Sequence, residues 1–209
     1  MATSTIQGGT EVAYEHRNRR GDVYLLQAGK TAKGNPRYYF GRRLSGAPVE
    51  EVPAGYEVFE SPERSQVYLR KKRGTRIAPI EREIVTEGIR KLSNADHFLV
   101  DVEEDCLVVY LPTRSLHQVN DMVRALAGPD ALQVPRFRAA RDQFVRESQH
   151  QKMMRFELLD EERRLYLVSR WCFLGSIDGW VQLAGPASLS DLVEAYAEHL
   201  GEESFFELF

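Results

Sequence analysis

The sequence predicts an α+β fold in which antiparallel hairpins pack with three to four helices. Two observations predict it. Short runs rich in aliphatic and aromatic residues occur in pairs around turn-forming residues, and capped amphipathic segments follow some of these pairs. The 209 residues are 43% hydrophobic and 28% charged, which allows a sizeable core beneath a charged surface. We therefore expect one large globular domain or two small ones.

Basic and acidic residues are unevenly distributed along the chain. Residues 1–80 carry 14 lysines and arginines against 8 acids, whereas residues 81–209 carry 14 against 23. Two halves of opposite net charge suggest that the basic half binds a partner of its own. We predict a basic, β-rich module over residues 1–76 and an acidic α+β body over residues 77–209.

Three strands are predicted in the basic module. Residues 22–28 and 37–42 are rich in β-forming residues, and the turn-rich segment 29–36 between them predicts a hairpin with a basic tip. Residues 66–72 alternate apolar and polar side chains with a period of two, which predicts a half-buried strand. The proline- and glycine-containing segment 44–65 is predicted to be a loop.

The acidic body is predicted to alternate hairpins and helices. Its helices are expected over residues 79–92, 115–127, 136–149 and 188–200. Its strands are expected over residues 98–102, 106–111, 153–159, 164–173 and 180–183. The first helix is predicted to bury an apolar stripe formed by Ile80, Ile84, Ile89 and Leu92. Ser115 and Ser188 are expected N-caps. The matching spacing of residues after each suggests a weak ββα duplication in the C-terminal part. The alternative is chance, because capped amphipathic helices often share this spacing.

The basic module carries the residue types of a nucleic-acid interface. Lysine and arginine neutralise phosphates, and aromatic rings stack on bases. The candidate nucleic-acid-binding residues are Arg19, Arg20, Lys30, Lys33, Arg37, Tyr38, Tyr39, Arg42, Arg43, Arg70 and Lys72. The alternative is that the acidic half of the same chain neutralises these cations, and that the rings fill a small core. We predict a non-enzymatic protein that binds DNA or RNA.

Two sequence features suggest an enzyme instead. Gly21-Asp22-Val23-Tyr24 and Tyr39-Phe40-Gly41-Arg42 resemble the paired halves of a GIY-YIG endonuclease core over about twenty residues, and depart from both of its tripeptides. The resemblance implies two tyrosine-containing strands, a helical arginine and a distant metal-binding glutamate. A cluster of Asp101, Glu103, Glu104 and Asp105 near His97 offers carboxylates for Mg²⁺, or a solvated hairpin tip. A divalent-metal nuclease is therefore a third functional hypothesis. Under the preferred, non-enzymatic hypothesis we expect no metal, cofactor or catalytic residue.

The second functional hypothesis is that the protein is a protein-interaction or adaptor subunit. Phe205 to Phe209 form an aromatic C-terminus that is expected to pack onto the body, onto a protein partner or onto a second copy. No apolar stretch approaches the length of a membrane span, and no leader is recognisable at the N-terminus, so no membrane partner is expected. The two cysteines, Cys106 and Cys172, lie in apolar runs and suggest a reducing, cytoplasmic location.

Overall fold

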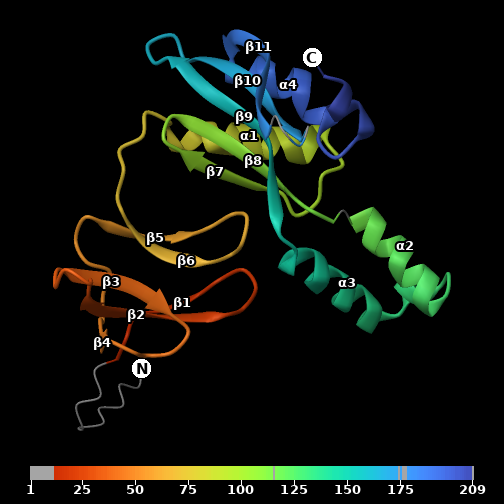
Figure 1. The fold of residues 1–209 in the computed structure, drawn as a ribbon. Coiled ribbons are helices and arrows are strands. Elements are labelled where there is room, and N and C mark those ends of the chain that lie inside the picture. The colour runs from red at the N-terminus through yellow and green to blue at the C-terminus, as the bar shows by residue number, and fades with distance from the viewer. Residues whose placement is uncertain (1–11, 115, 174, 176–177, 209) are drawn as a thin grey trace, which may run out of the picture. The chain divides into compact units, whose positions relative to one another are not determined.

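The computed structural model describes residues 12–114, 116–173, 175 and 178–208 (Figure 1). The chain divides into two compact units. Unit 1 comprises the described residues of Met1–Ser61 and Ser65–Lys72, and unit 2 comprises Pro62–Arg64 and those of Arg73–Phe209. The expected mixed architecture is confirmed, because the described residues form eleven strands in antiparallel sheets and four α-helices. None of these helices is long and apolar enough to cross a membrane.

Unit 1 is built from two small sheets. The first contains β1 (Glu15–Arg17), β2 (Val23–Lys30), β3 (Pro36–Gly41) and β4 (Ala47–Pro48), all organised around β2. The second pairs β5 (Tyr56–Glu60) with β6 (Val67–Lys71). Tyr24, Leu26 and Val67 are buried. The ring of Tyr38 on β3 meets the ring of Tyr56 on β5 edge-on at 6.1 Å, so the inner faces of the two sheets pack together.

The predicted loop over residues 44–65 is wrong, because it contains β4 and β5. The strand predicted over residues 66–72 is present as β6, but it pairs with β5 and not with the β2–β3 hairpin. Residues 56–60 read Tyr-Glu-Val-Phe-Glu, which fits a strand, yet the prolines and glycines on either side masked it. The partner of β6 was therefore not foreseen.

Unit 2 is a five-stranded antiparallel sheet with helices on one face. The sheet order is β11 (Asp178–Ser188), β10 (Leu165–Phe173), β9 (His150–Asp160), β8 (Cys106–Pro112) and β7 (Leu99–Glu103). The helices α1 (Pro79–Leu92) and α4 (Leu189–Tyr196) lie against each other on one face of this sheet (Figure 1). Two short 3₁₀ turns, Ala197–His199 and Glu203–Glu207, follow α4. Alternate strand residues and both helices supply one continuous hydrophobic core.

The buried face of α1 differs from the predicted stripe. Glu81, Val85 and Ile89, spaced four residues apart, are the buried residues of this helix. Ile80, which was expected to be buried, is 58% exposed. Ile89 is buried and Ile84 packs against the core as predicted, whereas Leu92 is 36% exposed. The position of Glu81 on the buried face was missed because a carboxylate there looked solvent-facing. A cation from the turn between β9 and β10, Arg164, makes its burial possible, as described in the Discussion.

Gly88 lets α1 and α4 approach closely. A methyl group at this position would lie 2.1 Å from Cγ1 of Val193, whose side chain is buried. Changing Gly88→Ala is therefore expected to lower the free energy of unfolding by about 1–3 kcal/mol, although alanine favours helices intrinsically. Urea denaturation of the single variants and of Gly88→Ala with Val193→Ala measures the coupling. The double variant should lose less unfolding free energy than the two single variants lose together. Losses that simply add would contradict the contact.

The two remaining helices form a hairpin between β8 and β9. α2 (Leu116–Ala127) and α3 (Pro135–Glu147) pack on each other, with a 3₁₀ turn at Ala131–Gln133 between them. The expected cap at Ser115 lies outside the described residues, whereas Ser188 caps α4 by accepting the Asp191 N–H. Because α2 packs on α3 while α4 packs on α1 and the sheet, a common ββα unit is not confirmed.

Candidate nucleic-acid interface

The end of the β2–β3 hairpin extends past the other strands of its sheet. β1 pairs with residues 23–25 of β2, and β4 pairs with Gln27 and Ala28. Beyond these positions β2 pairs only with β3, through Gly29 opposite Arg37 and Lys30 opposite Pro36. These two rungs and the turn over residues 31–35 form a two-stranded extension, which we call the ribbon.

The turn at the end of the ribbon is closed by its own hydrogen bonds. The Thr31 N–H donates to the Asn35 carbonyl at 2.9 Å, and the Gly34 N–H donates to the Thr31 carbonyl at 2.8 Å. Gly34 has a φ of +82°, a left-handed conformation that glycine adopts without strain. The tip is therefore a defined turn, and it presents Lys33 to solvent.

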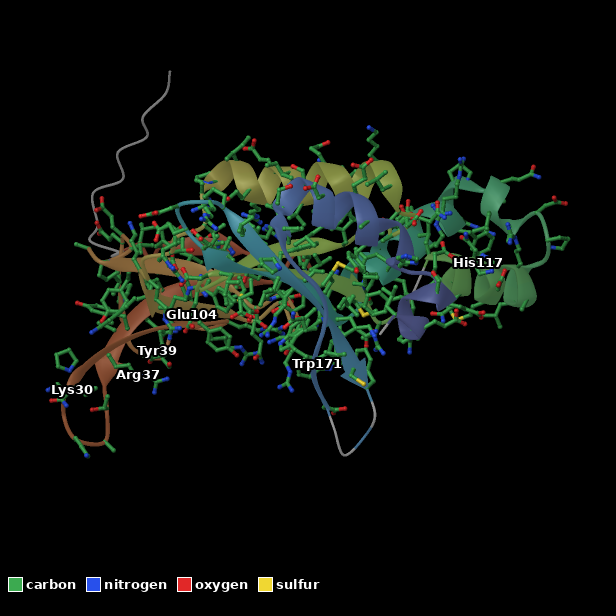
Figure 2. All side chains as sticks on the ribbon, turned by 90° about the horizontal axis from the view of Figure 1, so that it is seen from above. Lys30, Arg37, Tyr39, Glu104, His117 and Trp171 are labelled. Atoms are coloured by element: carbon green, nitrogen blue, oxygen red, sulfur yellow. The ribbon has the colours of Figure 1, made fainter. Side chains whose placement is uncertain are left out.

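The ribbon carries positive charge without a compensating acid nearby in the sequence. Residues 23–49 contain five lysines and arginines and no aspartate or glutamate. Lys30, Lys33 and Arg37 are all exposed. Within the described part of the chain, none of these three side chains takes part in an ion pair. Figure 2 shows Lys30, Arg37 and Tyr39 at the same end of unit 1.

Tyr39 holds Arg37 in place on one face of the ribbon. The Arg37 guanidinium carbon lies 5.3 Å from the centroid of the Tyr39 ring, within the range of a cation–π contact. The Tyr39 hydroxyl lies 3.2 Å from the hydroxyl of Ser45. Gly29 makes room for this ring, because a methyl group there would approach Cε1 of Tyr39 to 3.2 Å.

A buried glutamine anchors the loop that carries Arg43. Gln27 is fully buried, and its Nε2 donates to the Arg43 carbonyl at 3.0 Å. Its Oε1 accepts the N–H groups of Ser45 and Gly46 at 2.7 and 2.8 Å. Gly46 is required here, since a methyl group would lie 2.3 Å from the Ala28 carbonyl oxygen. Sequence reasoning missed Gln27, because no local pattern signals that an amide in a strand binds a loop sixteen or more residues away.

Three other candidate cations are engaged with carboxylates of unit 1. Nη1 of Arg19 lies 3.2 Å from Glu60 Oε1, Nη2 of Arg42 lies 2.8 Å from Asp22 Oδ2, and Nε of Arg70 lies 2.7 Å from Glu57 Oε1. Burial lowers the pKa of Arg19, whereas the hydrogen bond with Tyr24 and then the charge of Asp22 raise the pKa of Arg42. These three carboxylates belong to residues 1–80, so the basic half itself pairs with these cations, whereas the alternative expected the acidic half to do so.

The remaining candidates do not all lie on one surface. Adjacent residues in a strand point to opposite faces, and Tyr38 faces Tyr56 while Tyr39 is on the other face of β3. Arg70 lies over the Phe59 ring at 3.9 Å on the outer face of the β5–β6 sheet, away from the packed inner faces. Lys72, just after β6, is exposed.

Arg20 lies beside Arg19 and is half-buried. Its backbone N–H donates to Asn18 Oδ1 at 3.1 Å, and its Nε is buried without a hydrogen-bond partner. The eleven candidates therefore do not form one group: some are exposed on the ribbon, Arg43 and Lys72 are exposed outside it, and the rest contact other residues of unit 1.

The helical arginine implied by the GIY-YIG resemblance has no counterpart in unit 1, whose described residues form strands and turns only. Tyr24 is buried, with Arg42 5.7 Å above its ring. The described residues also contain no group of three or more His, Cys, Asp or Glu side chains placed to hold a metal ion. In unit 2, burial raises the pKa of Cys106 to about 11.

The acidic hairpin tip of unit 2 binds a basic segment of the same unit. Arg73 lies 3.3 Å from Glu104, and Arg76 lies 2.5 Å from Asp105. The hydrogen bond from Arg76 lowers the pKa of Asp105. Arg73 and Arg76 are therefore paired with acids within unit 2.

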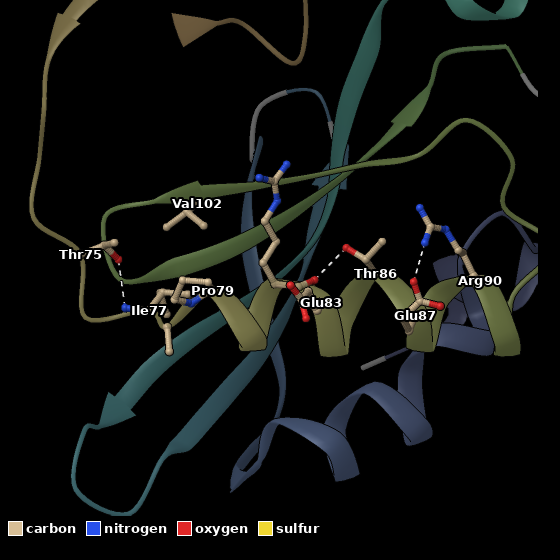
Figure 3. A pocket seen from close by; sticks show the side chains of 10 residues that line it. Thr75, Ile77, Pro79, Glu83, Thr86, Glu87, Arg90 and Val102 are labelled. Carbon is tan, nitrogen blue, oxygen red and sulfur yellow. Dashed lines mark hydrogen bonds and ion pairs between the residues drawn. The ribbon is translucent and has the colours of Figure 1, made fainter. Parts of the chain in front are cut away.

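A cavity of about 570 Å³ lies between α1 and the edge strand β7 (Figure 3). Ile77, Pro79 and Val102 contribute apolar surface, while Arg90 bonds to Glu87. Because its described polar groups largely bond to one another, we assign no ligand to this cavity.

The aromatic C-terminus packs onto unit 2 itself. Phe205 is fully buried in the core, and Nε of Arg170 donates to the Leu208 carbonyl at 2.7 Å. Phe206 is 53% exposed, and Phe209 lies outside the described residues. Among the described residues, the ribbon is the strongest candidate interface. Comparisons with family models, curated proteins and solved structures find no match.

Proposed function

We propose that this protein binds nucleic acid non-enzymatically through the ribbon of unit 1. Lys30, Lys33 and Arg37 contact phosphates, with Arg43 as a further cation on the adjacent loop. The observation that carries the proposal is the set of exposed ribbon cations in a stretch of 27 residues, 23–49, that contains no acid. Cations already bound to carboxylates must break an ion pair before they can contact phosphate, whereas these need not.

Reversing the three ribbon charges tests the proposal. The variant Lys30→Glu, Lys33→Glu, Arg37→Glu should lose most of its affinity, measured by fluorescence polarisation with a labelled oligonucleotide. If three phosphates are contacted on a duplex, log K for the unchanged protein should fall with log salt with a slope of about −2.7. That slope corresponds to a loss of about 40-fold in affinity from about 50 to about 200 mM salt. In the variant the contribution of these three contacts to the slope should be lost.

A matched control separates the ribbon from net charge. The variant Lys91→Glu, Arg124→Glu, Arg163→Glu changes the net charge equally at exposed positions of unit 2. Its affinity should stay close to that of the unchanged protein. Equal losses in the two variants, or no binding by the unchanged protein at low salt, would reject the proposed function.

A further inference from the structure

Tyr38 and Tyr39, which follow the ribbon on β3, have neighbours within unit 1. Single-stranded nucleic acid is usually held by aromatic rings on which successive bases stack. The ring of Tyr39 has Arg37 over it and its hydroxyl beside Ser45, and Tyr38 meets Tyr56 edge-on. A base could stack on the face of Tyr39 that Arg37 covers only after displacing that guanidinium, whereas Tyr38 is 38% exposed. Residues 29–37, which form the ribbon, contain no aromatic side chain, so the ribbon itself offers no platform on which the bases of a single strand could stack.

The ribbon cations project to both sides. Gly29 and Arg37 form one rung of the ribbon, and Lys30 and Pro36 form the next, so Arg37 and Lys30 point to opposite faces. Lys33 extends from the turn between them. One phosphate backbone can meet the cation of only one face together with the tip. Two backbones that flank a groove can meet all three.

The dimensions of the ribbon suit one groove in particular. Paired strands lie about 4.8 Å apart, and the major groove of B-form DNA is about 12 Å wide, which admits a two-stranded ribbon. The major groove of A-form RNA is deep and too narrow for side chains to enter. Cations on both faces of a ribbon in the wider groove would face the two phosphate backbones that border it.

We infer that the nucleic acid bound by this protein is B-form duplex DNA, with the ribbon in the major groove and Lys30 and Arg37 directed at opposite backbones. The inference rests on the proposed function and specifies its ligand. Sequence preference is expected to be small, because phosphate contacts position a protein but do not read bases.

Fluorescence polarisation with four probes of equal length and matched sequence tests the inference: duplex DNA, single-stranded DNA, duplex RNA and single-stranded RNA. Duplex DNA should bind most tightly, with a salt slope of about −2.7 for three phosphates. A single strand that reaches only two cations should give a slope of about −1.4. Equal or tighter binding of a single strand or of duplex RNA overturns the inference and leaves the proposed function standing. No binding of any probe rejects both.

The groove itself is tested by filling it. A duplex in which cytosine is replaced by glucosylated 5-hydroxymethylcytosine keeps its phosphates but carries bulky sugars in the major groove. We expect its affinity to fall severalfold relative to the unmodified duplex, and equal affinity would exclude insertion into that groove. Single Lys30→Ala and Arg37→Ala variants should each reduce the steepness of the duplex slope by about 0.9, whereas Lys72→Ala, exposed but outside the ribbon, should leave it unchanged. An effect confined to one face would also contradict the inference.

Discussion

Replacing Glu81 by alanine is expected to lower the free energy of unfolding by about 3 kcal/mol. Glu81 is 6% exposed and accepts hydrogen bonds from Nε of Arg164 at 2.8 Å and from Nη2 of the same side chain. Its Oε2 also accepts the Ala78 N–H at 2.8 Å, where α1 begins. The alanine variant leaves the guanidinium and this N–H without their acceptor. The value is at the lower end for a broken buried pair because Arg164 is partly exposed to water.

The same carboxylate should make stability depend on pH. Burial alone raises the pKa of Glu81, but hydrogen bonds from Arg164, Tyr166 and the Ala78 N–H outweigh it, so the pKa is lowered from 4.5. The stabilisation is therefore complete above the pKa of the unfolded chain and is lost as the pH falls through the lower pKa of the folded chain.

Urea denaturation from about pH 7 to about pH 3 measures this dependence. The difference in stability between the unchanged protein and Glu81→Gln should shrink as the pH falls. The exposed Glu83→Gln on the same helix is the control and should follow the unchanged protein. A difference that stays constant with pH would mean that Glu81 is not ionised in its pair. Asp105, whose pKa is also lowered, should preserve part of the pH dependence in every variant.

Phe205→Ala is expected to cost about 3–5 kcal/mol of unfolding free energy, since it removes a fully buried ring from the core of unit 2. The neighbouring Phe206 is 53% exposed, so Phe206→Ala should change stability by less than about 1 kcal/mol. Thermal or urea denaturation of both variants measures the difference. If both variants matched the unchanged protein, the C-terminal segment would not belong to the folded core.

This prediction also concerns the hypothesis that the C-terminus docks onto a protein partner. Deletion of residues 205–209 would remove Phe205 and the carbonyl of Leu208 that Arg170 contacts. Any loss of a protein partner after such a deletion must therefore be separated from loss of folding. Phe206→Ala is the cleaner probe of a surface contact.

Local sequence patterns predicted the elements better than their contacts. Helix α1 was expected over residues 79–92 and is observed at Pro79–Leu92, because Pro79 begins it and two basic residues lie in its last turn. Its buried face was misjudged, since the burial of Glu81 depends on Arg164, which lies 83 positions away. A pairing over that distance leaves no periodic signal.

For the candidate interface too, local features could be predicted from the sequence and contacts between distant residues could not. The basic tip between two strands was visible locally, and the stretch without acids from 23 to 49 could have singled it out. Alternation along β3 also implies that Tyr38 and Tyr39 cannot serve one surface. The neutralisation of Arg19 by Glu60, 41 positions later, could not be read from neighbouring residues. Which cations remain for a ligand is decided by the folded arrangement.

The contact between Arg37 and Tyr39 has a consequence for the energetics of binding. A free arginine side chain samples many rotamers and loses up to about 2 kcal/mol of conformational entropy when it is fixed. Stacking on a tyrosine whose hydroxyl lies beside Ser45 restricts those rotamers before any ligand arrives. Arg37 is thus preorganised, and its immobilisation should oppose association less than that of the unstacked Lys30 and Lys33.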